Sequence, residues 1–345
     1  MKDRFINLFV LMLLTSILVQ AQNQNYVENV SKRGTQAAQF LKIPQGARAT
    51  SMGSAFTAVA DDPSSIFWNV AGIARQPQNT AMFEHTQWFA DVDYNAASTS
   101  FNIGGMGAVG VSFISSNYGD MKVTTIEDPE GTGEMFTASD IAVSIGWAMN
   151  ISDNFSVGLN PKLISQSIWK TNSTALAIDF GVLYNTPFKG ITLGMSITNF
   201  GQKMQLTGNS TVILVDQDIE TVGNNDNIPA HLQTEKWDLP MGFKLGIAWD
   251  AINSEDHRLL FAADASHPSD DYESVNAGCE YVFQDVFSLR GGYKNMFLDY
   301  AEETFSVGAG LKQKFLRNVN VSLDYSYTYF NRLGSIQKFA VSFNF

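Results

Sequence analysis

The side chains best suited to chemistry are spread thinly along this sequence of 345 residues. Its four histidines, His85, His231, His257 and His267, lie far apart, and none belongs to an HExxH or Cys-x-x-Cys pattern of the kind that holds zinc. The single cysteine, Cys279, has no second cysteine with which to form a disulfide bond. No G-x-S-x-G, dinucleotide-binding or phosphate-binding glycine motif is present either. We therefore expect no metal ion and no cofactor.

One short segment, His267-Pro-Ser-Asp270, contains the residue types of a hydrolase triad. A nucleophile, a base and an orienting carboxylate must converge in space, and neighbours in a single turn cannot easily do so, which favours a solvated turn. Acidic residues also collect in the segments 116–137 and 201–238, but without the spacing of an EF-hand, so solvated loops are preferred to a calcium site. These features predict that the protein is not an enzyme.

The first residues predict export. Lys2 and Arg4 precede an apolar run over residues 5–19, and the small residue Ala21 follows closely. This pattern is typical of a secretory signal peptide, which we assign to residues 1–21. The alternative, a retained membrane anchor, is disfavoured because the run is short for a helix that spans a bilayer.

The composition limits the possible partners. The net charge of −12 argues against nucleic acid or an anionic lipid surface as the main partner, because both attract lysine and arginine. Hydrophobic residues make up 45% of the chain, yet no stretch after the leader reaches the roughly twenty consecutive apolar residues of a spanning helix. A chain of this kind enters a membrane only as strands.

From about residue 80 onward, apolar and polar residues alternate with a period of two. In residues 319–329, valine, leucine and tyrosine form one face, and asparagine, serine, aspartate and threonine form the other. A soluble β-sandwich also alternates. However, only 16% of the residues are charged, against about 25% in typical soluble domains, and the polar faces carry mostly small residues. This favours a transmembrane antiparallel β-barrel over residues 80–345.

The alternating segments number about fourteen, an even count that suits a bacterial barrel. They are expected near residues 80–88, 93–103, 105–115, 138–149, 154–168, 172–186, 190–200, 239–252, 257–268, 273–284, 286–295, 303–315, 317–328 and 336–345. If the first strand runs outward, both long connections lie outside and the short turns lie inside, as in bacterial barrels. This predicts a protein of the bacterial outer membrane with both termini in the periplasm.

The chain ends in an alternating strand whose last residue is aromatic. Phe343 and Phe345 resemble the C-terminal signal that the barrel assembly machinery reads in its substrates. A closing strand of any β-protein can also end in phenylalanine by chance. With the leader and the alternation, the pattern favours outer-membrane assembly, with outer-membrane lipids and the assembly machinery as partners.

The segment 46–74, "GARATSMGSAFTAVADDPSSIFWNVAGIA", fits neither a core helix nor an ordinary strand. Fourteen strands enclose more space than wall side chains fill, because about eight already suffice for a filled interior. The segment is therefore predicted to plug the lumen with a short helix over residues 64–69. Asp62 is expected to cap that helix, Pro63 to take its first position, and Gly72 to end it.

Other residues of this segment suit a place inside the barrel. Gly46 and Gly53 allow the chain to turn or to approach the wall closely. Arg48, Asp61 and Asp62 are candidates for ion pairs with lumen residues of opposite charge. The alternative is that the N-terminal extension, residues 22–79, lies in the periplasm or adds an edge strand.

The same residues carry a family resemblance. The N-terminal signature of the PorV/PorQ family resembles Phe40-Leu-Lys-Ile43, Gly46-Ala-Arg-Ala49, Met52-Gly53, Ala55-Phe56, Ala60-Asp-Asp-Pro63 and Trp68-Asn69-x-Ala71-Gly72. The sequence departs from it at Val70, where the family usually has proline, and at Ser54, which is often glycine. The resemblance implies a FadL-like barrel of fourteen strands. For PorV itself it implies a role in the type IX secretion system.

Two functions follow from these observations. A PorV-like protein would bind or shuttle secreted proteins that carry a C-terminal signal domain, together with other secretion-system components. A FadL-like transporter would pass hydrophobic small molecules across the outer membrane. The inward strand faces are small and polar, while the long connections carry apolar residues, so docking is ranked above transport. The candidate cargo-loop residues are Met204, Leu206, Ile213 and Leu214.

Overall fold

The computed structural model describes residues 32–216, 227–298, 301–316 and 319–345. These residues belong to one compact unit, Lys32–Phe345. The predicted signal peptide, residues 1–21, lies outside the described residues, as does the first part of the extension 22–79.

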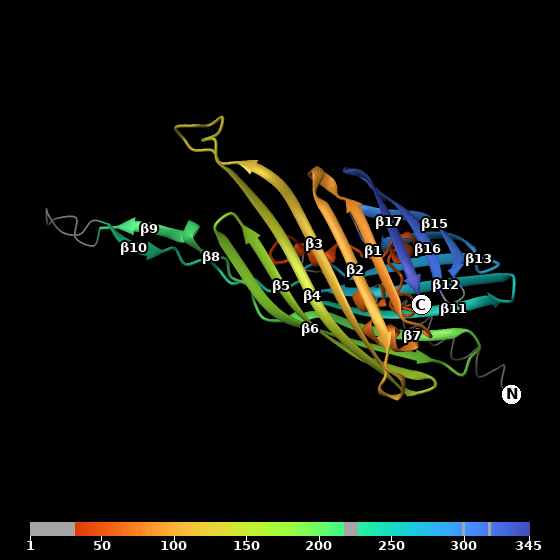
Figure 1. The fold of residues 1–345 in the computed structure, drawn as a ribbon. Helices are drawn as coiled ribbons and strands as arrows, with labels where there is room; N and C mark the ends of the chain where they lie inside the picture. The colour runs from red at the N-terminus through yellow and green to blue at the C-terminus, as the bar shows by residue number, and fades with distance from the viewer. Residues whose placement is uncertain (1–31, 217–226, 299–300, 317–318) are drawn as a thin grey trace, which may run out of the picture. The chain divides into compact units, whose positions relative to one another are not determined.

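The unit is a closed antiparallel β-barrel of 14 strands, as predicted (Figure 1). Its strands are β1 (Thr80–Gln87), β2 (Asp93–Asn102), β3 (Ala108–Lys122), β4 (Met135–Ser152), β5 (Phe155–Ile168), β6 (Thr171–Asn185), β7 (Ile191–Gly201), β11 (Gly242–Asn253), β12 (His257–Pro268), β13 (Ser274–Phe283), β14 (Phe287–Met296), β15 (Glu303–Leu316), β16 (Val319–Phe330) and β17 (Gly334–Asn344). The ring closes where β1 pairs with β17, so that Thr80 faces Asn344.

The alternation of the sequence explains the two faces of this wall. Large apolar side chains such as Ile145, Leu163 and Leu176 are exposed on the outside. Serine, asparagine and other small polar residues alternate with them and are buried inside. Within the described residues, no helix combines the length and the apolar composition needed to cross a membrane.

The connection between β7 and β11 carries the short elements β8 (Thr207–Gly208), η5 (Asn209–Thr211), β9 (Val212–Val215) and β10 (Ile228–His231). β9 and β10 form a separate two-stranded sheet that projects away from the barrel (Figure 1). Two further short helices, η3 (Phe89–Asp91) and η4 (Gly104–Met106), lie in the turns on either side of β2.

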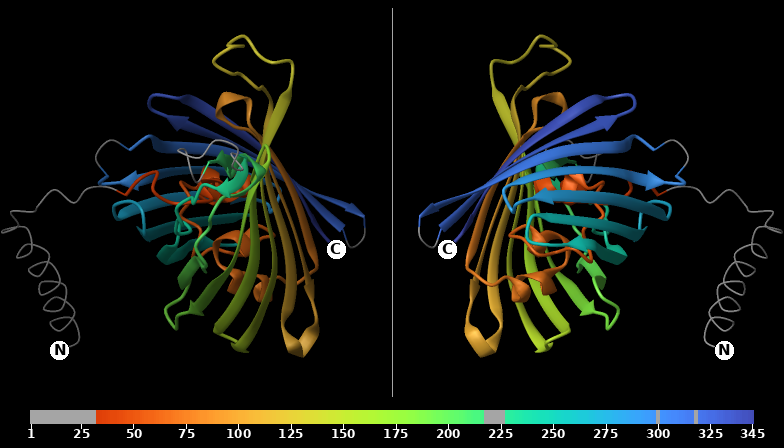
Figure 2. Two further views of the ribbon diagram at one scale, coloured as in Figure 1. Left: turned by 90° about the vertical axis from the view of Figure 1, so that its left-hand side faces the viewer. Right: turned by 90° about the vertical axis from the view of Figure 1, so that its right-hand side faces the viewer.

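The N-terminal segment runs inside the ring of strands (Figure 2). It contains η1 (Gln39–Lys42), α2 (Ala47–Ser51), α3 (Ser65–Trp68) and η2 (Val70–Arg75). We call residues 32–79 the inner segment.

The two mouths of the barrel differ. The loop end carries the connections after β3, β7 and β12, so both long connections lie at the same mouth, as the loop parity predicts. The terminus end carries Phe345, whose backbone N–H bonds to the carbonyl of Asn79. At the loop end, Arg33 pairs with Asp271 at 2.6 Å. The described chain therefore starts and finishes at opposite mouths. Residues 1–31 lie outside the described residues, so the expectation that both termini share one side stays a prediction.

Candidate functional site

The inner segment packs against the barrel wall at a level where many of the inward-facing wall residues are glycine. Eight of these glycines form cross-strand pairs on neighbouring strands. The pairs are Gly110 with Gly146, Gly158 with Gly181, Gly194 with Gly246, and Gly278 with Gly292. We call these eight residues the glycine seat.

Close approach of the inner segment explains why the seat lacks side chains: side chains of the segment meet Gly110 and Gly146, and its backbone comes close to the other six glycines. A Cβ atom at Gly292 would lie 2.1 Å from the backbone nitrogen of Gly53, and one at Gly278 would lie 2.2 Å from the carbonyl oxygen of Met52. At Gly194 the corresponding distance to the Thr57 carbonyl oxygen is 2.4 Å. Any side chain at these three positions would displace the inner segment, so wall and segment fit there only as backbone against backbone.

Charged side chains anchor the segment near the terminus end. Arg48 on α2 donates from Nε and Nη2 to the two carboxylate oxygens of Glu280 on β13, both at 2.7 Å. Arg290 on β14 donates to Glu280 and to Asp324 on β16, both at 2.6 Å. Arg48 also contacts Asp61 at 2.5 Å and Asp62 at 3.2 Å within the segment. A bidentate guanidinium pair of this kind is both strong and directional when buried.

Hydrogen bonds hold the segment at further points of the wall. The Asp264 carboxylate on β12 accepts from the backbone N–H groups of Phe56 and Thr57 at 3.0 and 2.9 Å. On β17, the buried Lys338 ammonium donates to the carbonyl of Pro44 at 2.6 Å. The barrel thus satisfies backbone groups of the segment at both ends of the stretch from Pro44 to Thr57.

The helical part of the segment differs from the expected capping pattern. Asp62 does not cap α3, because its carboxylate accepts from the Ser64 N–H at 2.8 Å and so forms a turn one residue before the helix. Pro63 lies in that turn, before the helix. The N-cap residue of α3 is Ser64, which makes no side-chain capping bond. A side-chain cap occurs at the next helix, η2, where Asn69 Oδ1 accepts from Ala71 N–H at 3.2 Å. Gly72 lies inside η2 and does not end a helix.

Three residues of the predicted motif serve packing. Trp68 is buried and donates its indole N–H to the Gln45 carbonyl at 2.7 Å. Gly53 has φ of +65° against the wall, and Gly46 has φ of +86° beside Ser64. Both glycines adopt left-handed backbone that other residues rarely adopt, in agreement with the expectation of a turn or a close approach.

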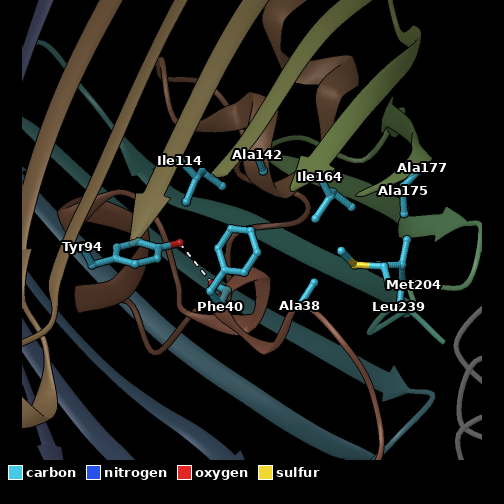
Figure 3. Packing of buried hydrophobic residues seen from close by; sticks show 10 residues of the cluster. All are labelled: Ala38, Phe40, Tyr94, Ile114, Ala142, Ile164, Ala175, Ala177, Met204 and Leu239. Carbon is cyan, nitrogen blue, oxygen red and sulfur yellow. Dashed lines mark hydrogen bonds between the residues drawn. The ribbon is translucent and has the colours of Figure 1, made fainter. Parts of the chain in front are cut away.

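A buried apolar cluster closes the loop end of the lumen (Figure 3). Phe40 from η1 lies near Tyr94 of β2, whose hydroxyl donates to the Phe40 carbonyl at 3.3 Å. Met204 belongs to this cluster and is only 1% exposed. This burial differs from the exposed position expected of a cargo-loop residue, because backbone bonds to Trp237 hold Met204 in the cluster with Leu239.

The remaining cargo-loop candidates do lie on the surface. Leu206, Ile213 and Leu214 are 37%, 39% and 64% exposed. In the last strand, Phe343 pairs with Ala81 of β1, and Phe345 is exposed beside the seam.

Two cavities flank the inner segment and share no lining residue. The cavity at the terminus end measures about 210 Å³ and is lined largely by charged residues of the Arg48 network. The loop-end cavity measures about 460 Å³. Its apolar lining comes from both the segment and the strand ends: Leu41, Ile43, Pro44, Phe67, Trp68, Trp88, Ile114, Met241 and Phe330.

The residues suspected of chemistry do not assemble. His267 Nδ1 lies 2.9 Å from the exposed carboxylate of Glu273, whereas Asp270 is buried and binds Lys42 at 2.9 Å. No group of three His, Cys, Asp or Glu side chains suited to a metal ion occurs within the part of the chain that the structure describes.

A family model described as "Uncharacterised protein family (UPF0164)" matches residues 15–211, more than half of the chain. The chain belongs to UPF0164. None of the curated proteins compared with the chain matches it.

Solved structures of barrels match this UPF0164 chain over 87% of its length. A FadL homologue of Pseudomonas aeruginosa is 14% identical, with 96% of its own chain covered and a TM-score of 0.51. The toluene transporter TodX of Pseudomonas putida is 12% identical, with 97% covered and a TM-score of 0.53. The toluene transporter TbuX of Ralstonia pickettii is 13% identical, with 97% covered and a TM-score of 0.52. The fold is thus that of FadL-like outer-membrane barrels, while the resemblance to PorV and PorQ stays an interpretation of the motif.

Proposed function

We propose that this chain forms a passage for hydrophobic small molecules in the bacterial outer membrane and catalyses no reaction. The loop-end cavity carries this proposal. Its volume of about 460 Å³ lies within the range of small-molecule sites, and its walls combine large apolar side chains with polar and charged ones. The fold shared with the toluene transporters TodX and TbuX supports the same function.

The outer surface supports the location. Exposed apolar side chains cover the outside of the barrel, which suits contact with outer-membrane lipids. Insertion by the barrel assembly machinery, with Phe343 and Phe345 as its signal, belongs to the same proposal.

Filling the cavity tests the passage. In cells without other routes for toluene, Leu41→Trp should abolish the uptake that the wild-type protein confers, because Leu41 lines the cavity. The matched control is Leu163→Trp, which adds the same side chain to the outer face, where Leu163 is exposed. Equal uptake by both variants at equal amounts of folded protein would exclude passage through this cavity.

Docking of secreted proteins in type IX secretion is the second candidate function. The apolar residues Ile213 and Leu214 on the projecting β9 favour it. Deleting the gene and measuring both the secreted and surface proteins and the hydrocarbon uptake separates the two functions. Lost uptake with normal secretion supports passage, and the opposite result supports docking.

A further inference from the structure

The sheet formed by β9 and β10 stands apart from the barrel wall. Among the described residues, β9 pairs with β10 and with no other strand. One face of the two strands carries only apolar residues, the cross-strand pairs Ile213 with Ala230 and Val215 with Ile228. A two-stranded sheet without a third strand or a packed face is at best marginally stable in water. An added strand would therefore stabilise this sheet.

The phase of the hydrogen bonds shows which backbone groups of β9 point outward. The N–H of Leu232 donates to the Thr211 carbonyl at 2.8 Å, at the register position next to Val212. Hydrogen-bonded and non-hydrogen-bonded pairs alternate in an antiparallel ladder, so Val212 and Leu214 direct their N–H and C=O groups away from β10. Each residue has one donor and one acceptor, and the open edge of β9 thus offers two of each.

The outer edge of β10 is blocked. Pro229 lies opposite Leu214, so its nitrogen also points away from the partner strand, and it carries no hydrogen to donate. Proline on an edge strand hinders the pairing of a further strand. β9 has the sequence VILV, without proline, and the side chains of Val212, Ile213 and Leu214 are exposed. The sheet therefore has one open edge, and that edge belongs to β9.

The chemistry of this edge identifies the class of partner. A row of backbone donors and acceptors at strand spacing is matched by the backbone of another extended polypeptide, whereas lipid tails have no such groups. A second copy of this chain fits poorly. Two β9 edges related by a two-fold axis pair antiparallel, and β9 projects beyond the loop-end mouth, so the two barrels would point in opposite directions (Figure 1). Copies in one membrane point the same way.

We propose that the open edge of β9 binds an extended segment of another protein as an added strand. Apolar side chains at alternate positions of that segment would extend the face formed by Ile213 and Ala230, while its backbone pairs with Val212 and Leu214. This surface is separate from the loop-end cavity, because no residue of β9 or β10 lines that cavity. The proposal rests on the second candidate function, docking of a protein, and not on passage.

A synthetic peptide tests the proposal without knowledge of the natural partner. The probe is a short fluorescent peptide of alternating valine and threonine, flanked by lysine. Its control has the same sequence with N-methyl groups on alternate residues, which keeps the side chains and removes backbone donors. Binding is followed by fluorescence anisotropy with the full-length mature protein in a non-ionic detergent. We expect one bound peptide per chain, and at least about tenfold weaker binding of the methylated peptide.

Three variants locate the binding edge. Leu214→Pro removes an outward N–H and keeps the ladder to β10, so it should weaken peptide binding at least about tenfold. Its matched control is Leu214→Thr, which changes the side chain but keeps the N–H, and which should bind much more tightly than Leu214→Pro. Pro229→Ala restores the missing donor of β10 and should raise the stoichiometry from one bound peptide to two.

Equal binding by Leu214→Pro and Leu214→Thr, equal binding of the two peptides, or no binding of the peptide to the wild type would overturn the proposal. A wild-type dimer that Leu214→Pro dissociates, measured by light scattering, would assign the edge to a second copy instead. Unheated samples that migrate differently from boiled ones on a denaturing gel show that each variant is folded. All three variants should confer the toluene uptake of the wild type, so a wild type without uptake counts against passage alone.

Discussion

The substitution Gly292→Ala tests the glycine seat directly. Its new Cβ would lie 2.1 Å from the Gly53 nitrogen, whereas ordinary contacts begin at 3.4 Å, so the inner segment must move by about 1.3 Å. That shift breaks the hydrogen bonds of Ser306, which accepts from Gly53 N–H at 3.0 Å and donates to the Thr50 carbonyl at 2.7 Å. Two lost hydrogen bonds at about 1 kcal/mol each, with an overpacking cost of about 1–3 kcal/mol, give a destabilisation of about 3–5 kcal/mol.

The neighbouring residue supplies the control. Gly291 has nothing within 4 Å of its would-be Cβ, so Gly291→Ala makes the same chemical change on the opposite face of the same strand. In planar bilayers, Gly292→Ala should conduct ions more readily than the wild type and Gly291→Ala should not, since a barrel of this size opens when its filling moves. Urea titration of the folded form should show the same order of stability. Equal conductance and equal stability of the two variants would refute the tight fit of wall and segment.

Three further substitutions probe other parts of the molecule, each by urea titration of the folded barrel in lipid vesicles. Arg48→Leu removes the bidentate partner of the buried Glu280, which then keeps Arg290 alone, and also the ion pair of Asp62, so it should cost about 3–5 kcal/mol. Arg332→Leu removes an exposed pair and should change little; equal losses would contradict the anchoring role. Met204→Ala should lower the free energy of unfolding by about 2–5 kcal/mol, and Leu214→Ala should lower it much less, because Met204 is buried and Leu214 is exposed. The reverse order would contradict the burial of Met204. Val70→Pro should be tolerated within about 1 kcal/mol, because Val70 opens η2 and the preceding backbone is extended; an unfolded variant would disprove this.

The barrel could be predicted because one face of each strand meets lipid and the other meets the lumen, which imposes a period of two on the sequence. The ends of the strands are harder to predict from the sequence. β3 and β4 extend to Lys122 and back to Met135, well beyond the predicted 105–115 and 138–149. Their outer parts are exposed on both faces and contain a register shift between Asn117 and Asp120, so the alternation fades there.

Only part of the candidate site can be predicted from the sequence. The segment 46–74 and its charged residues were identified, but the cavity was not, because much of its apolar lining comes from the inner segment and from strand ends. The polar inward faces led instead to a low ranking of transport. The sequence does contain a signal for the glycine seat, because glycine recurs at inward positions of several strands. The cross-strand pairs of these glycines can be recognised only once the strand register is known.

The path of the inner segment gives the molecule an unusual connectivity. The described part of the chain begins near Arg33 at one mouth, passes through the lumen, leaves at Asn79 at the other mouth and then becomes the first strand of the ring around it. The inner segment therefore passes through a barrel that is formed by the residues that follow it in the same chain. The inner segment leaves the lumen only when the chain before it is drawn lengthwise through the barrel or when the seam between β1 and β17 opens. Assembly faces the same choice in reverse, so the order in which the seam closes and the inner segment enters decides whether the ring is ever empty.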